Sequence, residues 1–150
     1  MAILPRPIIG RFWRCTNYDD AGEDSVSNLP VWTGAASGRP LREATVHHSI
    51  DGSFSIRKGQ WKLQMCPGSG GWSRPRPGSE CEGLPPVQLY DLESDIGERR
   101  NLQGERPEIV EELKHLLTRY IEDGRSTPGR AQANDGGSAW EQLWWRNARG

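Results

Sequence analysis

The adjacent histidines His47 and His48 have side chains that can bind ligands, coordinate metals or carry protons. They fall within a segment whose apolar and polar residues alternate as in a β-strand, so their side chains are expected to point to opposite faces. Two histidines arranged in this way cannot both bind one metal ion, which argues against a zinc site. His48 lies on the same side as Val46 and Ala44, so a hydrogen-bonded core position and a role in binding both stay open for it.

Two further groups carry side chains that suit an anion or a sugar. Arg57, Lys58 and Lys62 crowd the end of a predicted hairpin, where they either face an anion or simply solvate the strands and block further pairing. In the sequence GSGGW, Gly68–Trp72, glycine permits close approach of the backbone, and Trp72 either offers a flat face to a sugar or aryl ring or caps the core. The candidate substrate-binding residues are His47, His48, Lys58 and Trp72.

The segment from Arg42 to Met65 must position most of these side chains. Its alternation of apolar and polar residues predicts three short strands, and a fourth is expected beyond a long loop over 67–86. Tight turns at Asp51-Gly52 and Gly59-Gln60 are predicted to join the first three strands as hairpins. The predicted strands are Ala44–Ile50, Phe54–Lys58, Trp61–Met65 and Val87–Leu92.

One amphipathic helix is expected to cover the apolar face of this sheet. The stretch Pro107–Asp123 carries apolar residues at helical spacing, with Pro107 suited to the first turn and Gly124 to the C-terminal stop. A single helical turn is also expected near Ser25–Leu29. The fold class is therefore α+β, a small four-stranded antiparallel β-sheet packed against one C-terminal amphipathic α-helix.

The composition limits both the core and the partners. Hydrophobic residues make up 34% of the chain, which has 18 glycines and 11 prolines, so we expect a small core and many loops. With a formal net charge of −1, the chain has no overall electrostatic field that favours binding to nucleic acid or a membrane. No stretch resembles a membrane span or a signal peptide. The three cysteines do not form a disulfide framework, although a disulfide between Cys66 and Cys81, which flank the long loop, stays open.

An ordered series of motifs links the chain to a known family. No single motif is specific, but together they resemble the C-terminal subdomain of type I, arylsulfatase-like sulfatases, over most of the chain. The motifs are the strand segment 42–65, GSGGW at Gly68–Trp72, QLYDL at Gln88–Leu92 and GRSTPG at Gly124–Gly129, within a resemblance that runs from about Ala21 to Asp135. The expected divisions are an N-terminal segment and linker over 1–40, the subdomain over 41–126 and a tryptophan-rich tail over 127–150.

The resemblance implies a chemistry whose central groups do not occur here. In the family, a cysteine in a C-x-P-x-R or C-x-A-x-R setting becomes the formylglycine nucleophile, and Asp, Asn or Gln oxygens hold calcium. Cys15, Cys66 and Cys81 all lack that setting, so we interpret them as ordinary thiols. The pair Asp19-Asp20 is similar to the family's metal-binding pair, but no buried strand precedes it, and we interpret it as a solvated turn. We expect no catalytic residue, no metal ligand and no cofactor in this chain.

The expected function is that of a C-terminal subdomain of a sulfuric ester hydrolase, inactive alone, whose loops shape the substrate cleft. Its expected partner is the catalytic domain of a sulfatase or a neighbouring subunit. We expect it to bind neither nucleic acid nor a membrane. Two alternatives stay open: a stand-alone binding module for a sulfated small molecule, and a purely structural fragment. In the tail, Trp140, Leu143 and Trp144 fit one helical face and are expected to dock on a neighbouring surface.

Overall fold

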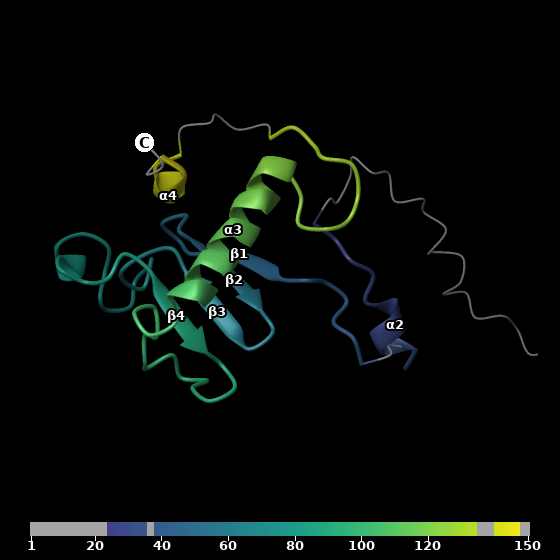
Figure 1. Cartoon of the computed structure of the whole chain (residues 1–150), viewed down its shortest axis with the longest axis horizontal. Coiled ribbons are helices and arrows are strands. Elements are labelled where there is room, and N and C mark those ends of the chain that lie inside the picture. Colours follow the sequence, from purple (N-terminus) through teal and green to yellow (C-terminus); the bar gives the residue numbers. More distant parts are fainter. Residues whose placement is uncertain (1–23, 36–37, 135–139, 148–150) are drawn as a thin grey trace, which may run out of the picture.

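The computed structural model describes residues 24–35, 38–134 and 140–147. Four antiparallel strands form one sheet in the order β1-β2-β3-β4, and the long helix α3 lies across one of its faces (Figure 1). This arrangement confirms the predicted α+β class. The elements are α2 (Leu29–Trp32), β1 (Thr45–His48), β2 (Phe54–Lys58), β3 (Trp61–Gln64), β4 (Gln88–Asp91), α3 (Pro107–Asp123) and α4 (Trp144–Asn147), with 3₁₀ turns at Ser79–Cys81 and Glu141–Leu143.

The register of the strands determines which side chains meet α3. Residues opposite each other in an antiparallel pair share a face, so one row across the sheet forms the apolar strip under the helix. This row is Val46, Ile56, Leu63 and Leu89. Its last three members are fully buried, and Phe54 and Met65 extend the core at the next pair along.

The helix α3 supplies the other half of the core. Its buried side chains recur at three- and four-residue spacing, as the sequence predicts. They are Val110, Leu113, Leu116, Leu117 and Tyr120. Gly124 ends the helix in the left-handed conformation with φ 62°, where its amide donates to the Ile121 carbonyl, so the predicted C-terminal stop is confirmed.

Several predicted boundaries differ from the structure. The first strand ends at His48 because the turn begins at Ser49, whose amide donates to the Ser53 carbonyl at 3.0 Å. The N-terminal helical turn lies at Leu29–Trp32 rather than Ser25–Leu29, because Pro30 is tolerated only within the first turn of a helix. Cys66 and Cys81 are both free thiols, so the disulfide between them does not form.

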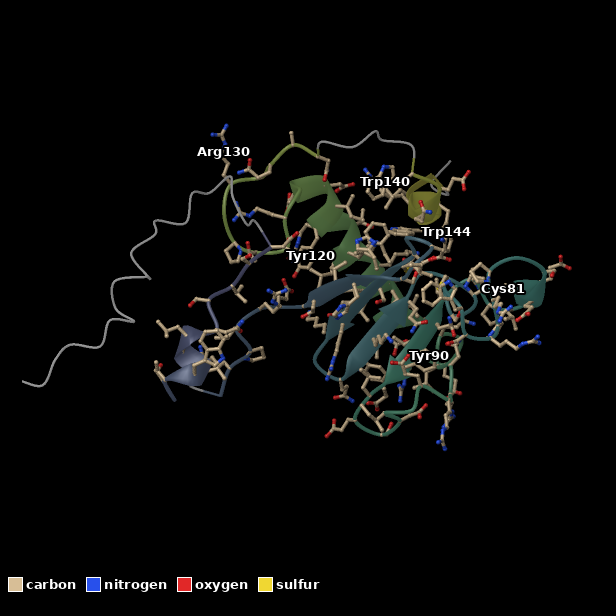
Figure 2. All side chains as sticks on the ribbon, turned by 180° about the vertical axis from the view of Figure 1, so that it is seen from behind. Cys81, Tyr90, Tyr120, Arg130, Trp140 and Trp144 are labelled. Atoms are coloured by element: carbon tan, nitrogen blue, oxygen red, sulfur yellow. The ribbon has the colours of Figure 1, made fainter. Side chains whose placement is uncertain are left out.

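The C-terminal segment packs on its own sheet and helix through Leu143, which was among the predicted residues, and through Trp145, which was not. Trp145, with 5% of its surface exposed, is buried together with Leu143, whereas Trp140 is 49% exposed. Figure 2 shows Trp140 and Trp144 at this C-terminal segment. The change from a 3₁₀ turn to an α-helical turn at Trp144 shifts the spacing, so the predicted face of Trp140, Leu143 and Trp144 does not form. The Trp145 ring meets the Phe54 ring edge-on with centroids 5.7 Å apart.

Within the described ranges, no helix has the length and apolar content needed to span a bilayer. The predictions for Cys15 and for Asp19-Asp20 fall outside these ranges, as do residues 1–23 of the expected N-terminal segment.

Candidate functional site

The sheet face that α3 leaves open is polar. Because paired residues share a face, two rows of polar side chains cross it beside each other. One row is Thr45, Arg57, Lys62 and Tyr90, and the other is His47, Ser55, Gln64 and Gln88. No large apolar side chain interrupts them, so this face is the candidate site on the sheet.

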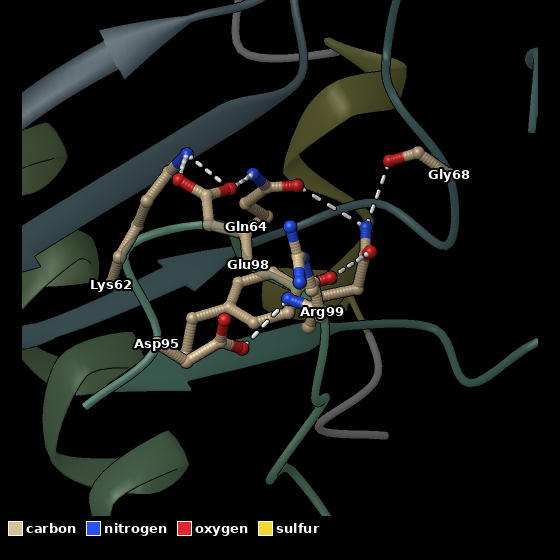
Figure 3. A network of polar contacts seen from close by, with 8 residues as sticks. Lys62, Gln64, Gly68, Asp95, Glu98 and Arg99 are labelled. Atoms are coloured by element: carbon tan, nitrogen blue, oxygen red, sulfur yellow. Dashed lines mark hydrogen bonds and ion pairs between the residues drawn. The ribbon is translucent and has the colours of Figure 1, made fainter. Parts of the chain in front are cut away.

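The β3–β4 half of the open face is a connected hydrogen-bond network (Figure 3). Lys62 Nζ donates to both carboxylate oxygens of Glu98, at 2.7 and 2.8 Å, and Gln64 Nε2 donates to Glu98 at 3.1 Å. Gln88 Nε2 donates to Gln64 Oε1 at 3.2 Å, while Tyr90 OH donates to Gln88 Oε1 at 2.7 Å. Burial raises the pKa of the Tyr90 hydroxyl, which keeps this donor protonated. These polar groups satisfy one another and form a rigid half of the face.

The loop after β4 holds Glu98 in position for this network. Glu98 has φ 53°, a left-handed conformation that is uncommon for a residue with a side chain. The Glu98 amide donates to the Asp95 carbonyl at 3.1 Å, and the Asp95 carboxylate accepts hydrogen bonds from the amides of Arg99 and Arg100 at 2.7 and 2.8 Å. Local hydrogen bonds therefore fix the turn that directs Glu98 onto the sheet.

A groove of about 470 Å³ lies on the same face and is lined by residues of β1 and β2 together with residues of β3 and of the loop after β4. Within the described part of the chain, the His47 ring and the Ser55 hydroxyl have no hydrogen-bond partner, and Arg57 uses only Nε, which donates to the Gly59 carbonyl at 3.1 Å. The unpaired polar groups of the open face are thus concentrated here. Residues lining the groove include His47, Ser55, Arg57, Lys62, Leu92, Ile96 and Glu98.

A larger cavity of about 800 Å³ lies between β1, the C-terminal end of α3 and the segment 140–147. Its cationic side chains already have partners. Arg42 Nη2 donates to the Asp24 carbonyl at 3.0 Å, and Arg146 lies 3.7 Å from Glu122. The buried Arg125 guanidinium donates to backbone carbonyls of its own loop. The smaller groove is therefore better suited to a charged ligand.

The structure does not bring the four predicted substrate-binding residues together. His47 and His48 both line the groove, but the His48 ring packs on Phe54 with centroids 4.1 Å apart, on the helix side of the sheet. Lys58 also lies on the helix side, where its Nζ donates to Glu112 at 2.8 Å, and this hydrogen bond raises the Lys58 pKa. Trp72 is 81% exposed on the long loop. Their role in binding stays a prediction.

Of the three basic residues at the end of the β2–β3 hairpin, Arg57 and Lys62 line the groove and Lys58 does not. The signal was present in the alternation of β2. Arg57 is two positions from Ser55 and therefore on the polar side, while Lys58 is two positions from the buried Ile56. Crowding of basic residues at a hairpin end does not reveal which of them share a face.

The surroundings of Cys66 are not those of a nucleophile. Burial raises the pKa of the Cys66 thiol, so little thiolate is present at neutral pH, and Cys66 Sγ donates to the Gly68 carbonyl at 3.2 Å. No group of three or more His, Cys, Asp or Glu side chains in the described ranges is placed to hold a metal ion. The expectation that this chain holds no calcium stays a prediction, and we assign no chemistry through that ion.

Comparisons with known proteins agree with the topology. An N-acetylgalactosamine-6-O-sulfatase from Bacteroides thetaiotaomicron is 32% identical over 102 residues, which cover 66% of this chain and 19% of the relative. A solved sulfatase structure, from work on the metabolism of multiple glycosaminoglycans by the same bacterium, matches with a TM-score of 0.51 and 29% identity, over 68% of this chain and 21% of that one. No protein-family profile matches the chain. The chain spans about a fifth of the length of these relatives.

Proposed function

Because the chain is sulfatase-like over about two thirds of its length, we propose that it acts as a C-terminal sulfatase subdomain that does not hydrolyse sulfate esters alone. Its place is beside a catalytic sulfatase domain, which supplies the nucleophile and the cation. The observation that carries the proposal is the partial coverage. The matched region corresponds to only 19% of the relative's length, and no cysteine of the printed sequence is followed by Pro or Ala at the second position and Arg at the fourth.

The long loop between β3 and β4 supports a role in shaping a substrate cleft. Gln88 Nε2 donates to the carbonyls of Cys66 and Gly68, both at 2.8 Å, and so ties the base of the loop to the sheet. Further along, the Trp72 carbonyl accepts a hydrogen bond from Arg76 Nε at 3.1 Å while its ring faces solvent. An exposed tryptophan on an anchored loop suits contact with a sugar or aryl ring.

Hydrolysis assays test the proposal directly. We expect the purified chain with calcium to release no nitrophenol from p-nitrophenyl sulfate, alongside an active sulfatase as the positive control. We further expect the chain to bind a sulfatase catalytic domain from which the matching C-terminal segment has been removed, and to increase its turnover. Turnover by the chain alone, or a lack of any association, contradicts the proposal.

A second candidate is a stand-alone module that binds a sulfated ligand. The unpaired polar groups of the groove favour it. Binding of a sulfated sugar without association with a catalytic domain would distinguish this function from the first.

A further inference from the structure

We propose that His47, Ser55 and Arg57 form a binding site for the anionic group of a sulfated sugar, on the face of the sheet opposite α3. The anion site rests on the geometry of the groove. Its assignment to a sulfate ester also rests on the proposed function.

The register of β1 and β2 places the three side chains together. His47 and Ser55 are directly opposite each other, so their Cβ atoms lie within about 5.5 Å. Arg57 follows Ser55 by two positions, which puts it on the same face about 7 Å along the strand. All three line the groove. Rigid strands rather than loops thus position the donors.

Hydrogen-bond satisfaction separates this site from the rest of the open face. The polar side chains of the β3–β4 half are engaged with one another, as the bonds of Lys62, Gln64 and Glu98 show. On the β1–β2 half, the ring nitrogens of His47 and the hydroxyl of Ser55 have no partner among the described residues. A ligand with oxygen acceptors can bind there without displacing an existing protein hydrogen bond.

Charge gives the site its preference for an anion. The positive charge of Lys62 is compensated by Glu98 at 2.7 Å, whereas Arg57 has no ion-pair partner within the described part of the chain. The bond from Arg57 Nε to the Gly59 carbonyl restrains the guanidinium and leaves both terminal nitrogens for a ligand. A planar guanidinium can donate two parallel hydrogen bonds to a tetrahedral oxyanion, which an ammonium group cannot do.

Two apolar side chains of the groove suit the carbon skeleton of a sugar. Leu92 and Ile96 are among the lining residues, and Ile96 is exposed. Glu98 also borders the groove, but its carboxylate accepts hydrogen bonds from Lys62 and Gln64, which offsets its repulsion of an anion. A combination of apolar side chains with a few directed donors is the usual composition of a small-ligand site.

Titration of the full chain with galactose 6-sulfate, followed by backbone NMR shifts and calorimetry, tests the site. We expect shifts centred on His47, Ser55 and Arg57 and a dissociation constant of about 1 mM. Arg57→Ala removes one charge-assisted contact and should weaken binding about tenfold. The affinity of Arg57→Lys should lie between those of the wild type and Arg57→Ala. Arg106→Ala is the matched control, because it removes the same guanidinium charge from an exposed residue that directly precedes α3 and does not line the groove; this variant should bind galactose 6-sulfate with unchanged affinity.

Three outcomes would overturn the proposal. One is equal affinity for galactose and galactose 6-sulfate, and another is unchanged affinity in a folded Arg57→Ala protein. The third is that inorganic sulfate binds as tightly as the sugar sulfate, which removes the assignment to a sulfated sugar. Urea unfolding of each variant verifies its folding. Association with the catalytic domain is measured separately, so a failure of the anion site and a failure of the subdomain function give different results.

Discussion

Lys62 Nζ lies 2.7 Å from the Glu98 carboxylate, although the two residues are 36 positions apart in the sequence. Lys62 comes from the middle of the sheet, and Glu98 comes from the loop that follows its last strand. The pair therefore joins that loop to the open face. It also fixes one border of the proposed anion site, since both residues line the groove.

Removal of this ion pair is expected to destabilise the chain. Its side chains are only 22% and 31% exposed, so Lys62→Met and Glu98→Gln should show a coupling of about 1 kcal/mol in a double-mutant cycle of urea unfolding. The pair Arg100–Glu105, at 70% and 57% exposure, is the control and should couple by less than about 0.5 kcal/mol. Additive effects of the Lys62 and Glu98 substitutions would show that the pair contributes no net stability.

Period-two alternation was sufficient to predict the sheet and its two faces. Ile56 and Leu63 alternate with polar neighbours and are fully buried, and the apolar spacing of 107–123 predicted α3 with its observed bounds. Local spacing shows which side chains share a face. This information is sufficient to predict a meander of antiparallel strands covered by one helix. Strand ends were less well predicted, because the turn at Ser49 depends on hydrogen bonds to Ser53.

The arrangement of the open face could not be predicted to the same extent. Nothing in the local sequence indicates that Glu98 reaches Lys62, because the contact depends on a turn in which Glu98 has a positive φ. The burial of Trp145 instead of Trp144 likewise depends on a change of helix type over one residue. Such features follow from tertiary packing and from strained local geometry.

Acid should destabilise the chain partly through Asp51. Burial opposes ionisation of this carboxylate, but hydrogen bonds from Ser49 Oγ at 2.6 Å and the Ser53 amide at 2.9 Å outweigh it and lower the Asp51 pKa below 3.8. A pKa lowered on folding stabilises the folded state above the unfolded value, and this stability is lost as the pH falls through the folded value.

We therefore expect the free energy of unfolding to fall more steeply below pH 4 in the wild type than in Asp51→Asn, which keeps an acceptor oxygen but has no charge. Urea unfolding between pH 5 and pH 2.5 measures this difference. Parallel pH profiles for the two proteins would contradict the assigned cause.

The Cys66 thiol should react slowly with alkylating reagents. Burial raises its pKa above the ordinary 9.0, so its thiolate fraction at pH 8 is small. In a protein carrying Cys15→Ser and Cys81→Ser, iodoacetamide should modify Cys66 at least about tenfold more slowly in the folded state than in urea, as mass spectrometry can follow. The raised pKa also stabilises the folded state at lower pH, and that contribution is lost as the pH rises above 9. Equal rates in the folded and unfolded states would show that Cys66 is accessible.

The contact of α3 with the sheet should dominate the stability of the chain. Leu113 is almost fully buried against the strands, so Leu113→Ala should cost about 2–5 kcal/mol of unfolding free energy. His115 lies on the exposed side of the same helix, and His115→Ala should change stability by less than about 0.5 kcal/mol. The midpoints of urea unfolding give both values, and similar midpoints for the two variants would place the core elsewhere.

Trp145 should contribute more stability than any other tryptophan of the segment 140–147. Its ring packs edge-on against Phe54, and its Nε1 donates to Thr118 Oγ1 at 3.1 Å, so it joins the segment to both the sheet and α3. Trp145→Ala removes a large buried surface and should lower the free energy of unfolding by about 3 kcal/mol. Trp140→Ala should lower it by less than about 1 kcal/mol, because Trp140 is half exposed. Thermal unfolding followed by far-UV circular dichroism compares the two variants. If Trp145→Ala unfolds at the wild-type temperature, the segment does not pack on the core in solution. Trp145→Ala and Trp140→Ala would then have similar free energies of unfolding.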